Sequence, residues 1–173
     1  MGGPRVTHSS CPTAVVNAPV NVVWSLLTNP AGWGSFFYIR FIRVSPEGPA
    51  AVGQMIYAES GPSILHLRIE FQLLKIDPAE HVLELVGRLP FRLVVHESLS
   101  CVSLGPNHCR VSYSCNFSLP PGWRGAFMGF LLRRKFDTGP ADSLGRLKRA
   151  AEGAHVGRPG SLARLSRTES GDP

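Results

Sequence analysis

The chain contains 173 residues, of which 43% are hydrophobic and 17% are charged, and this composition predicts one globular domain and excludes a chain that is disordered throughout. It has no apolar run near the ~18 residues of a membrane-spanning helix and no hydrophobic signal-peptide core at its start, so we expect a cytoplasmic protein without an integral membrane segment. The formal net charge is +6, but aromatic residues do not alternate with the basic ones as a base-stacking surface requires, so we expect no nucleic-acid partner.

The cysteine spacing argues against a metal site. No two of the four cysteines form a CxxC pair, and Cys109 and Cys115 have no histidine at ligand spacing. Buried, reduced thiols are the better interpretation. Neither GxGxxG nor GxxxxGK occurs, so nucleotide phosphates have no predicted binding loop. We therefore predict no metal and no cofactor.

The N-terminal part of the chain predicts a tail, a strand and two short helices. Residues 1–10 are expected to be a disordered tail, and residues 11–17 a short strand. Pro19 suits the first turn of a helix, where its missing N–H has no partner to lose, and apolar residues follow at helical spacing at positions 20, 23, 24 and 27. Asn29-Pro30 repeats this signal and begins a second helix, which holds Trp33, Phe36 and Phe37.

Residues 39–119 have the pattern of an antiparallel sheet. Six segments of β-type sequence are separated by short turn-forming stretches that contain proline or glycine. In residues 65–73, 91–101 and 109–119 the odd-numbered positions are mostly apolar and the even-numbered ones mostly polar. Successive side chains on a strand point to opposite faces, so the sheet is expected to have one dry face and one wet face.

This alternation also fixes the register of the last hairpin. Both odd-numbered faces point inward only if paired residue numbers add up to an even number, because a slip of one residue turns a strand inside out. A three-residue loop at 105–107, with Leu104 paired to His108, meets this condition. The resulting pairs are Glu97 with Cys115 and Leu99 with Tyr113. The register of the preceding hairpin is not decided by the sequence, because either the odd or the even positions of residues 82–86 suit the inner face.

A helix follows the sheet. Pro120-Pro121-Gly122 stops the last strand, and aromatic and aliphatic residues then recur at helical spacing to about residue 152. Gly139-Pro140 is expected to kink or split this helix. Its apolar face matches the dry face of the sheet, so we expect the helix to lie across the sheet. Residues 153–173 are rich in Gly, Ser, Arg and Pro and are predicted to be a disordered tail.

The order of these elements resembles the helix-grip fold of the START/polyketide cyclase (SRPBCC) superfamily. Four stretches carry the resemblance: VNAPVNVVWSLLTNPAGW (16–33), AVG (51–53), VHESL (95–99) and DSLGRLKRAAE (142–152). The resemblance implies one α+β domain over residues 11–152. That domain would have a curved, seven-stranded antiparallel sheet, two short helices after the first strand and a long C-terminal helix packed across the sheet.

The resemblance also implies a deep, mostly apolar cavity between the sheet and the last helix. Members bind lipids, sterols, polyketides, plant hormones or quinones, and some are cyclases, aromatases or dehydratases. The chain resembles a bacterial member of the polyketide cyclase/dehydrase type. Because one fold hosts many functions, the resemblance leaves open whether this chain is an enzyme.

Glu97 is the first candidate for chemistry because it interrupts an apolar stripe. A carboxylate on the dry face should have a raised pKa unless it is paired, and such a group can act as a general acid or base. Tyr113 shares the inner face and is the second catalytic candidate, because a phenol in an apolar pocket can orient a ligand carbonyl. The alternatives are that Glu97 pairs with an arginine or is turned outward by a bulge, and that Tyr113 is an ordinary core tyrosine.

Ten further residues are expected to line the cavity or, alternatively, to fill a packed core. All are apolar or aromatic, and we expect them on the inner face of the strands or on the apolar face of the last helix. They are Met55, Tyr57, Leu67, Ile69, Phe71, Leu99, Phe117, Phe127, Phe130 and Leu131.

We predict three functions, in order of preference. The first is binding of a hydrophobic small molecule, such as a lipid, a polyketide or a quinone, between sheet and helix. The second is a polyketide cyclase, aromatase or dehydratase that uses Glu97 as acid or base while Tyr113 orients the substrate. The third is an interaction module in which basic residues of the last helix contact an acidic partner or a membrane surface.

Overall fold

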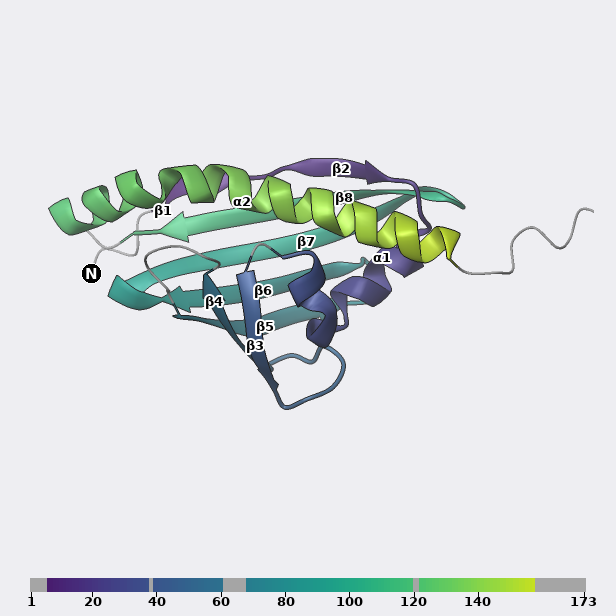
Figure 1. Ribbon diagram of the computed structural model, residues 1–173, viewed down its shortest axis with the longest axis horizontal. Helices are drawn as coiled ribbons and strands as arrows, with labels where there is room; N and C mark the ends of the chain where they lie inside the picture. Colours follow the sequence, from purple (N-terminus) through teal and green to yellow (C-terminus); the bar gives the residue numbers. More distant parts are fainter. Residues whose placement is uncertain (1–5, 38, 61–67, 120–121, 158–173) are drawn as a thin grey trace, which may run out of the picture.

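The computed structural model describes residues 6–37, 39–60, 68–119 and 122–157. One antiparallel sheet carries a long C-terminal helix, α2 (Trp123–Val156), along its length (Figure 1). The helix packs on the strands at one edge of the sheet and on the short helix near the N-terminus. This is the α+β helix-grip architecture predicted from the sequence.

The chain begins with β1 (Val6–Ser10), β2 (Thr13–Val16), α1 (Val20–Leu27) and the 3-10 helix η1 (Pro30–Ser35). Six strands follow, with the 3-10 turn η2 (Pro90–Arg92) before the fifth of them. They are β3 (Ile39–Ser45), β4 (Met55–Ser60), β5 (Arg68–Asp77), β6 (Val82–Leu89), β7 (Leu93–Gly105) and β8 (His108–Ser118).

The strands pair in the order β1-β8-β7-β6-β5-β4-β3, so β3 to β8 form a meander. β2 also pairs with β8, which makes eight strands where the sequence predicts seven. From His8 onward, β1 and β2 keep one register against β8. They are separated at Pro12, which has no backbone N–H to donate to Tyr113. The Tyr113 N–H still donates to the Pro12 carbonyl at 3.0 Å. The two strands are therefore one edge strand with an interruption.

Residues 6–10 correct the prediction of a tail over residues 1–10. They form β1, which pairs with β8, and the Ser9 hydroxyl donates to Asn116 Oδ1 at 2.7 Å on the wet face. Their sequence, VTHSS, lacks the alternation of a half-buried strand, so the distant partner strand determines their structure. Residues 1–5 lie outside the described residues. At the other end, α2 continues to Val156, so residues 153–156 are helical where a tail is predicted.

The predicted dry face of the sheet is the core of the protein. On β5, Ile69, Phe71 and Leu73 are buried, whereas Arg68 and Glu70 are exposed. The odd positions of β7 and β8 contribute most of the other strand residues of the core. On β6, where the sequence allows two choices, positions 83 and 85 belong to the core cluster.

The last hairpin has the predicted register but a different turn. The observed pairs include Glu97 with Cys115 and Leu99 with Tyr113, as predicted. Gly105 pairs with His108, so the connection has two residues rather than three. A bulge between residues 103 and 105 absorbs the difference and keeps both apolar faces inward.

α2 is one helix of 34 residues that continues through Pro140, so of the two predicted outcomes, a kink or a split, the split is wrong. Pro140 removes one backbone hydrogen bond, but contacts with the N-terminal part of the chain hold the helix on both sides of it. On one side, His8 Nε2 of β1 lies 2.7 Å from Asp137 Oδ1. On the other, the Asn17 N–H donates to Glu152 Oε1 at 2.9 Å.

Candidate functional site

Glu97 lies in the middle of β7 on the inner face of the sheet. Its neighbours on that face, Val95 and Leu99, are buried, and Cys115 of β8 lies directly opposite. The pairing of β7 with β8 is regular from residue 94 to residue 103, so no bulge turns the side chain outward. Glu97 is partly exposed, which leaves a route for proton exchange with solvent.

Two neutral donors contact the carboxylate of Glu97. The Cys115 Sγ lies 3.7 Å from Glu97 Oε1 and donates to it, and the nearby Tyr113 hydroxyl acts as a donor that lowers the pKa of the carboxyl group. Among the residues that the structure describes, no arginine, lysine or histidine pairs with this carboxylate. The arginine partner considered from the sequence is therefore not found in the described part of the chain.

Burial raises the pKa of Glu97 from 4.5 to about 7, and the hydrogen bonds from Tyr113 and Cys115 offset part of this rise. The cause is that a carboxylate loses hydration on the apolar face and gains no counterion there. A carboxyl group that titrates near neutral pH is present in both protonation states. It can therefore accept a proton in one step and return it in the next.

Tyr113 and Cys115 stay protonated at neutral pH. Burial, followed by the negative charge of Glu97, raises the pKa of Tyr113 well above 10, and the same causes raise the pKa of Cys115. Both groups are therefore donors and not nucleophiles. Burial also raises the pKa of Cys101 to about 12, as expected for a structural thiol, whereas Cys11 is exposed.

Phe37, in the connection between η1 and β3, packs beside Tyr113. The ring of Phe37 lies edge-on to Tyr113 with centroids 6.0 Å apart, and it also contacts Trp33 at 5.2 Å and Phe41 at 5.9 Å. The Trp33 indole donates to the Leu27 carbonyl at 3.0 Å, which ties the cluster to α1. The cluster is an apolar wall next to the two catalytic candidates. The contact of Phe37 with Tyr113 itself was not predicted, because no local sequence pattern connects the two residues.

Four of the ten predicted lining residues lie on the inner face, with Glu97. They are buried members of the core cluster, namely Ile69, Phe71, Leu99 and Phe117. Leu67 and the side chain of Leu131 lie outside the described residues. The four placed residues supply the apolar surroundings of the carboxyl group.

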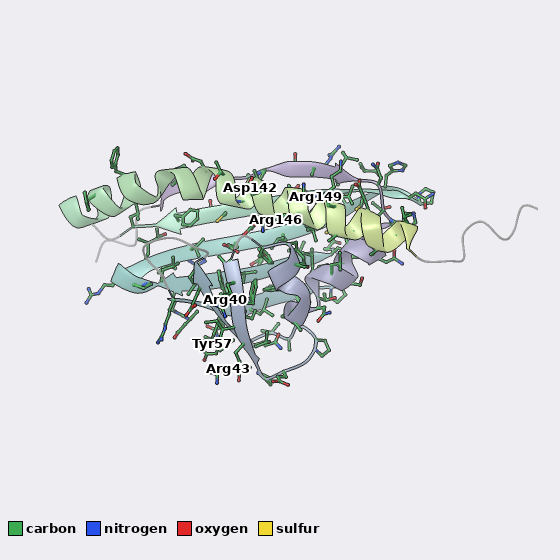
Figure 2. The ribbon with its side chains drawn as sticks, viewed as in Figure 1. Arg40, Arg43, Tyr57, Asp142, Arg146 and Arg149 are labelled. Carbon is green, nitrogen blue, oxygen red and sulfur yellow. The ribbon has the colours of Figure 1, made fainter. Side chains whose placement is uncertain are left out.

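Met55 and Tyr57 lie on the outer face, which corrects the prediction that they line the site. Their neighbours Ile56 and Ala58 are buried in the core, and side chains alternate along a strand. The Arg43 guanidinium lies 4.7 Å from the centroid of the Tyr57 ring, on the β3–β4 side of the sheet (Figure 2). β4 is apolar at odd and even positions alike, so its sequence does not decide which face is buried.

Phe127 and Phe130 of α2 are exposed, at 56% and 78%, which corrects the prediction that they face the sheet. Gly129 faces the sheet instead, since an added Cβ there would lie 2.8 Å from Leu119 Cδ1. An α-helix turns by about 100° per residue, so positions 127 and 130 lie about 160° and 100° away from Gly129 around the helix. The close helix–strand contact at Gly129 therefore turns both rings outward.

A metal centre and an edge groove are the other kinds of site that a chain of this fold can offer. In the described residues, no group of three or more His, Cys, Asp or Glu side chains is placed to hold a metal ion. A groove of about 690 Å³ lies along the β3 edge, between that strand, the start of η1 and residues 47–49. None of the predicted site residues lines this groove, so the chemistry points to the inner face around Glu97.

Residues 5–152 match the family described as "Polyketide cyclase / dehydrase and lipid transport". The chain belongs to this family. The matched residues include β1, which sequence reasoning assigned to a tail, and both catalytic candidates. The polyketide cyclase/dehydrase family thus accounts for nearly all the residues that the structure describes.

Solved structures show the same fold at low sequence identity. A norcoclaurine synthase point mutant from Thalictrum flavum, in complex with a transition-state analogue, has a TM-score of 0.67 and 11% identity over 89% of this chain and 99% of that chain. The Zhui aromatase/cyclase from Streptomyces sp. R1128 has a TM-score of 0.65 and 15% identity over 84% and 93%. A conserved protein from Geobacillus kaustophilus has a TM-score of 0.62 and 12% identity over 86% and 97%.

At these identities the likeness shows the helix-grip fold of this family and not a shared activity. No curated protein matches the sequence. The function of this chain therefore depends on the side chains of its own inner face.

Proposed function

We propose that this polyketide cyclase/dehydrase family member binds a hydrophobic, carbonyl-bearing small molecule between the sheet and α2, and that Glu97 transfers protons on it. The observation that carries the proposal is the carboxyl group of Glu97, which contacts only the neutral groups of Tyr113 and Cys115 among the described residues. A buried charge without a counterion is unfavourable, so a residue that merely filled the core would be apolar. The position suits a group that changes its charge.

The surroundings of Glu97 support binding of an apolar molecule. Leu99, Phe117 and Phe71 share its face of the sheet, and Phe37 packs beside Tyr113. Each Å² of apolar ligand surface removed from water contributes about 25 cal/mol. Glu97 and Tyr113 would then supply the few polar contacts that orient a ligand in an apolar site.

The proposed chemistry is aldol closure followed by loss of water. The Glu97 carboxylate takes a proton from a carbon between two carbonyls. The enolate carbon then forms a bond to the carbon of a third carbonyl in the same molecule. The protonated Glu97 returns its proton to the new alkoxide. In the dehydration, Glu97 takes a second carbon-bound proton, the C–O bond breaks, and the departing hydroxide takes that proton to leave as water. Tyr113, which stays protonated, donates to the carbonyl oxygen that gains charge.

Binding without turnover is the second candidate, and the apolar character of the inner face favours it. In that case Glu97 and Tyr113 only orient the ligand. The two candidates differ in what happens when the carboxyl group of Glu97 is replaced by an amide of the same shape.

The test measures base catalysis and binding separately. Ring opening of nitrobenzisoxazole, which begins when a base removes its C–H proton, reports catalysis, and fluorescence of an anilinonaphthalene sulfonate dye reports binding to the apolar site. We expect Glu97→Gln to slow ring opening by about 100-fold or more, because an amide cannot take the proton. We expect the dye affinity to stay within about twofold, because the shape of the side chain is kept.

A matched control is Glu84→Gln on β6, whose side chain alternates with the core residues Leu83 and Leu85. This variant should keep both readouts of the wild-type protein. Loss of ring opening and dye binding together in Glu97→Gln would contradict proton transfer and assign Glu97 to binding or structure. Ring opening at the wild-type rate in Glu97→Gln would remove Glu97 as the base.

A further inference from the structure

We infer that the first half of α2 docks on an anionic lipid membrane. The starting observation is the exposure of Phe127 and Phe130, at 56% and 78%. Single exposed apolar residues are common on protein surfaces. Two phenylalanines three positions apart on one helix form a patch, and exposed apolar patches mark interaction surfaces.

The two phenylalanines lie away from the packed side of the helix. Gly129 holds the opposite side of the helix against Leu119. The first turns of α2 extend past the ends of the strands in Figure 1, and the exposed fractions of Phe127 and Phe130 show that the sheet does not cover these two side chains.

The charge of α2 is concentrated in the same half. Residues 123–136 contain four basic residues and no acidic one, whereas residues 137–156 contain three of each. Figure 2 shows three of the latter, Asp142, Arg146 and Arg149, along the second half of the helix. In that half Lys148 Nζ also lies 3.8 Å from Glu152 Oε1. The excess positive charge therefore accompanies the exposed phenylalanines.

Aromatic residues next to basic ones on one helix are typical of helices that lie in the membrane interface, with the rings among the acyl chains and the charges at anionic headgroups. A second copy of this chain is a poorer occupant, because each copy would bring the same excess of positive charge to the contact. No helix of the described residues is long and apolar enough to span a membrane. The helix therefore lies on the surface of the bilayer, and the docking uses none of the contacts of Glu97.

The test is cosedimentation of the full chain with lipid vesicles. The probes are vesicles of phosphatidylcholine alone and vesicles of about three parts phosphatidylcholine to one part phosphatidylglycerol. We expect binding to the anionic vesicles that weakens as salt is added. The double substitution Phe127→Ala with Phe130→Ala should weaken this binding by about tenfold or more, because the two rings no longer enter the membrane interface. Replacing Arg133→Gln, Arg134→Gln and Lys135→Gln together should have an effect of at least the same size.

Matched controls lie elsewhere on the surface. Val102→Ala on β7, at a side chain exposed by 57%, controls for the loss of apolar surface, and Arg149→Gln on α2 controls for the loss of one charge. Both should keep wild-type binding to the anionic vesicles. Phe130→Trp adds a direct readout, since its fluorescence should be quenched by brominated lipid, whereas that of Val102→Trp should not.

Three results would overturn the inference. The first is equal binding of the wild-type protein to both kinds of vesicle, or no binding to either. The second is wild-type vesicle binding by the double phenylalanine variant. The third is a dimer in solution that dissociates when Phe127 and Phe130 are replaced, which would assign the patch to a second copy of the chain.

Discussion

Glu97 occupies an inner-face position of β7, where the alternation along the strand predicts an apolar side chain. Val95 and Leu99 flank it on the inner face, and the hydrogen bonds from Tyr113 and Cys115 only partly replace the water that a carboxylate binds. The rise of its pKa from 4.5 to about 7 corresponds to about 3 kcal/mol of preference for the neutral acid. The folded state therefore favours the protonated form of this residue.

Protein stability should consequently fall as the pH rises. The unfolded chain releases the Glu97 proton near pH 4.5 and the folded chain near pH 7, so the contribution of the neutral acid is complete below pH 4.5 and is lost as the pH passes through 7. Glu97→Gln cannot ionise. We expect it to be more stable than the wild-type protein by about 3 kcal/mol at about pH 8 and similar to it at about pH 4.5.

Urea denaturation of both proteins at these two pH values measures the difference. Other titrating groups contribute equally to the two curves and cancel in the comparison. A difference in free energy of unfolding that is the same at both pH values, or a Glu97→Gln variant that is less stable at the higher pH, would contradict the assigned pKa.

At the level of elements, Gly87 of β6 lets the ring of Phe71 lie across the inner face. The residues Phe71, Gly87 and Val95 form one row across three strands. A Cβ added at Gly87 would lie 2.5 Å from Val95 Cγ1 and 2.7 Å from Phe71 Cε1. The missing side chain thus provides the space that the ring occupies.

Gly87→Ala should destabilise the protein by about 1–3 kcal/mol, because both neighbours must move. A smaller side chain at position 71 should relieve the clash, so the double variant Gly87→Ala with Phe71→Leu should lose less than the sum of the two single variants. Chemical denaturation measures these values. Gly145→Ala on α2, where the nearest atom to the added Cβ is Arg149 Nη1 at 3.9 Å, is the control and should not destabilise the protein. A Gly87→Ala variant as stable as the wild-type protein would contradict the packing.

The same level shows which elements a sequence can predict. Alternation identified the meander and the inner face of β5, β7 and β8, because these strands are dry on one side only. Alternation did not predict β1, whose polar residues pair with β8. It also assigned the wrong face of β4 to the core, because odd-numbered and even-numbered residues are both apolar in Met55, Ile56, Tyr57 and Ala58. The sequence allowed a split at Pro140, where the helix is continuous and is contacted on both sides by the N-terminal part of the chain.

At the level of the whole molecule, the site combines local and distant information. The pairing of Glu97 with Cys115 was predicted, because the alternation of apolar and polar residues in β7 and β8 fixes the register of this one hairpin. The packing of Phe37 on Tyr113 and the contact of His8 with Asp137 join segments that share no local pattern, so only the folded chain brings them together. The fold itself is shared with proteins of 11–15% identity, because the order of elements is kept while the side chains differ. Those side chains are where activity has to be tested.

The most direct test is the titration of Glu97 itself. In the protein labelled with ¹³C at the glutamate side-chain carboxyl, the Glu97 signal is identified by its absence from the Glu97→Gln variant, and its chemical shift is followed against pH. A midpoint close to 7 would show a carboxyl group that changes its charge at neutral pH on the inner face, as proton transfer requires. A midpoint at or below 4.5, the ordinary value, would mean that the carboxylate is hydrated or paired and would contradict its role as the acid and base of the site.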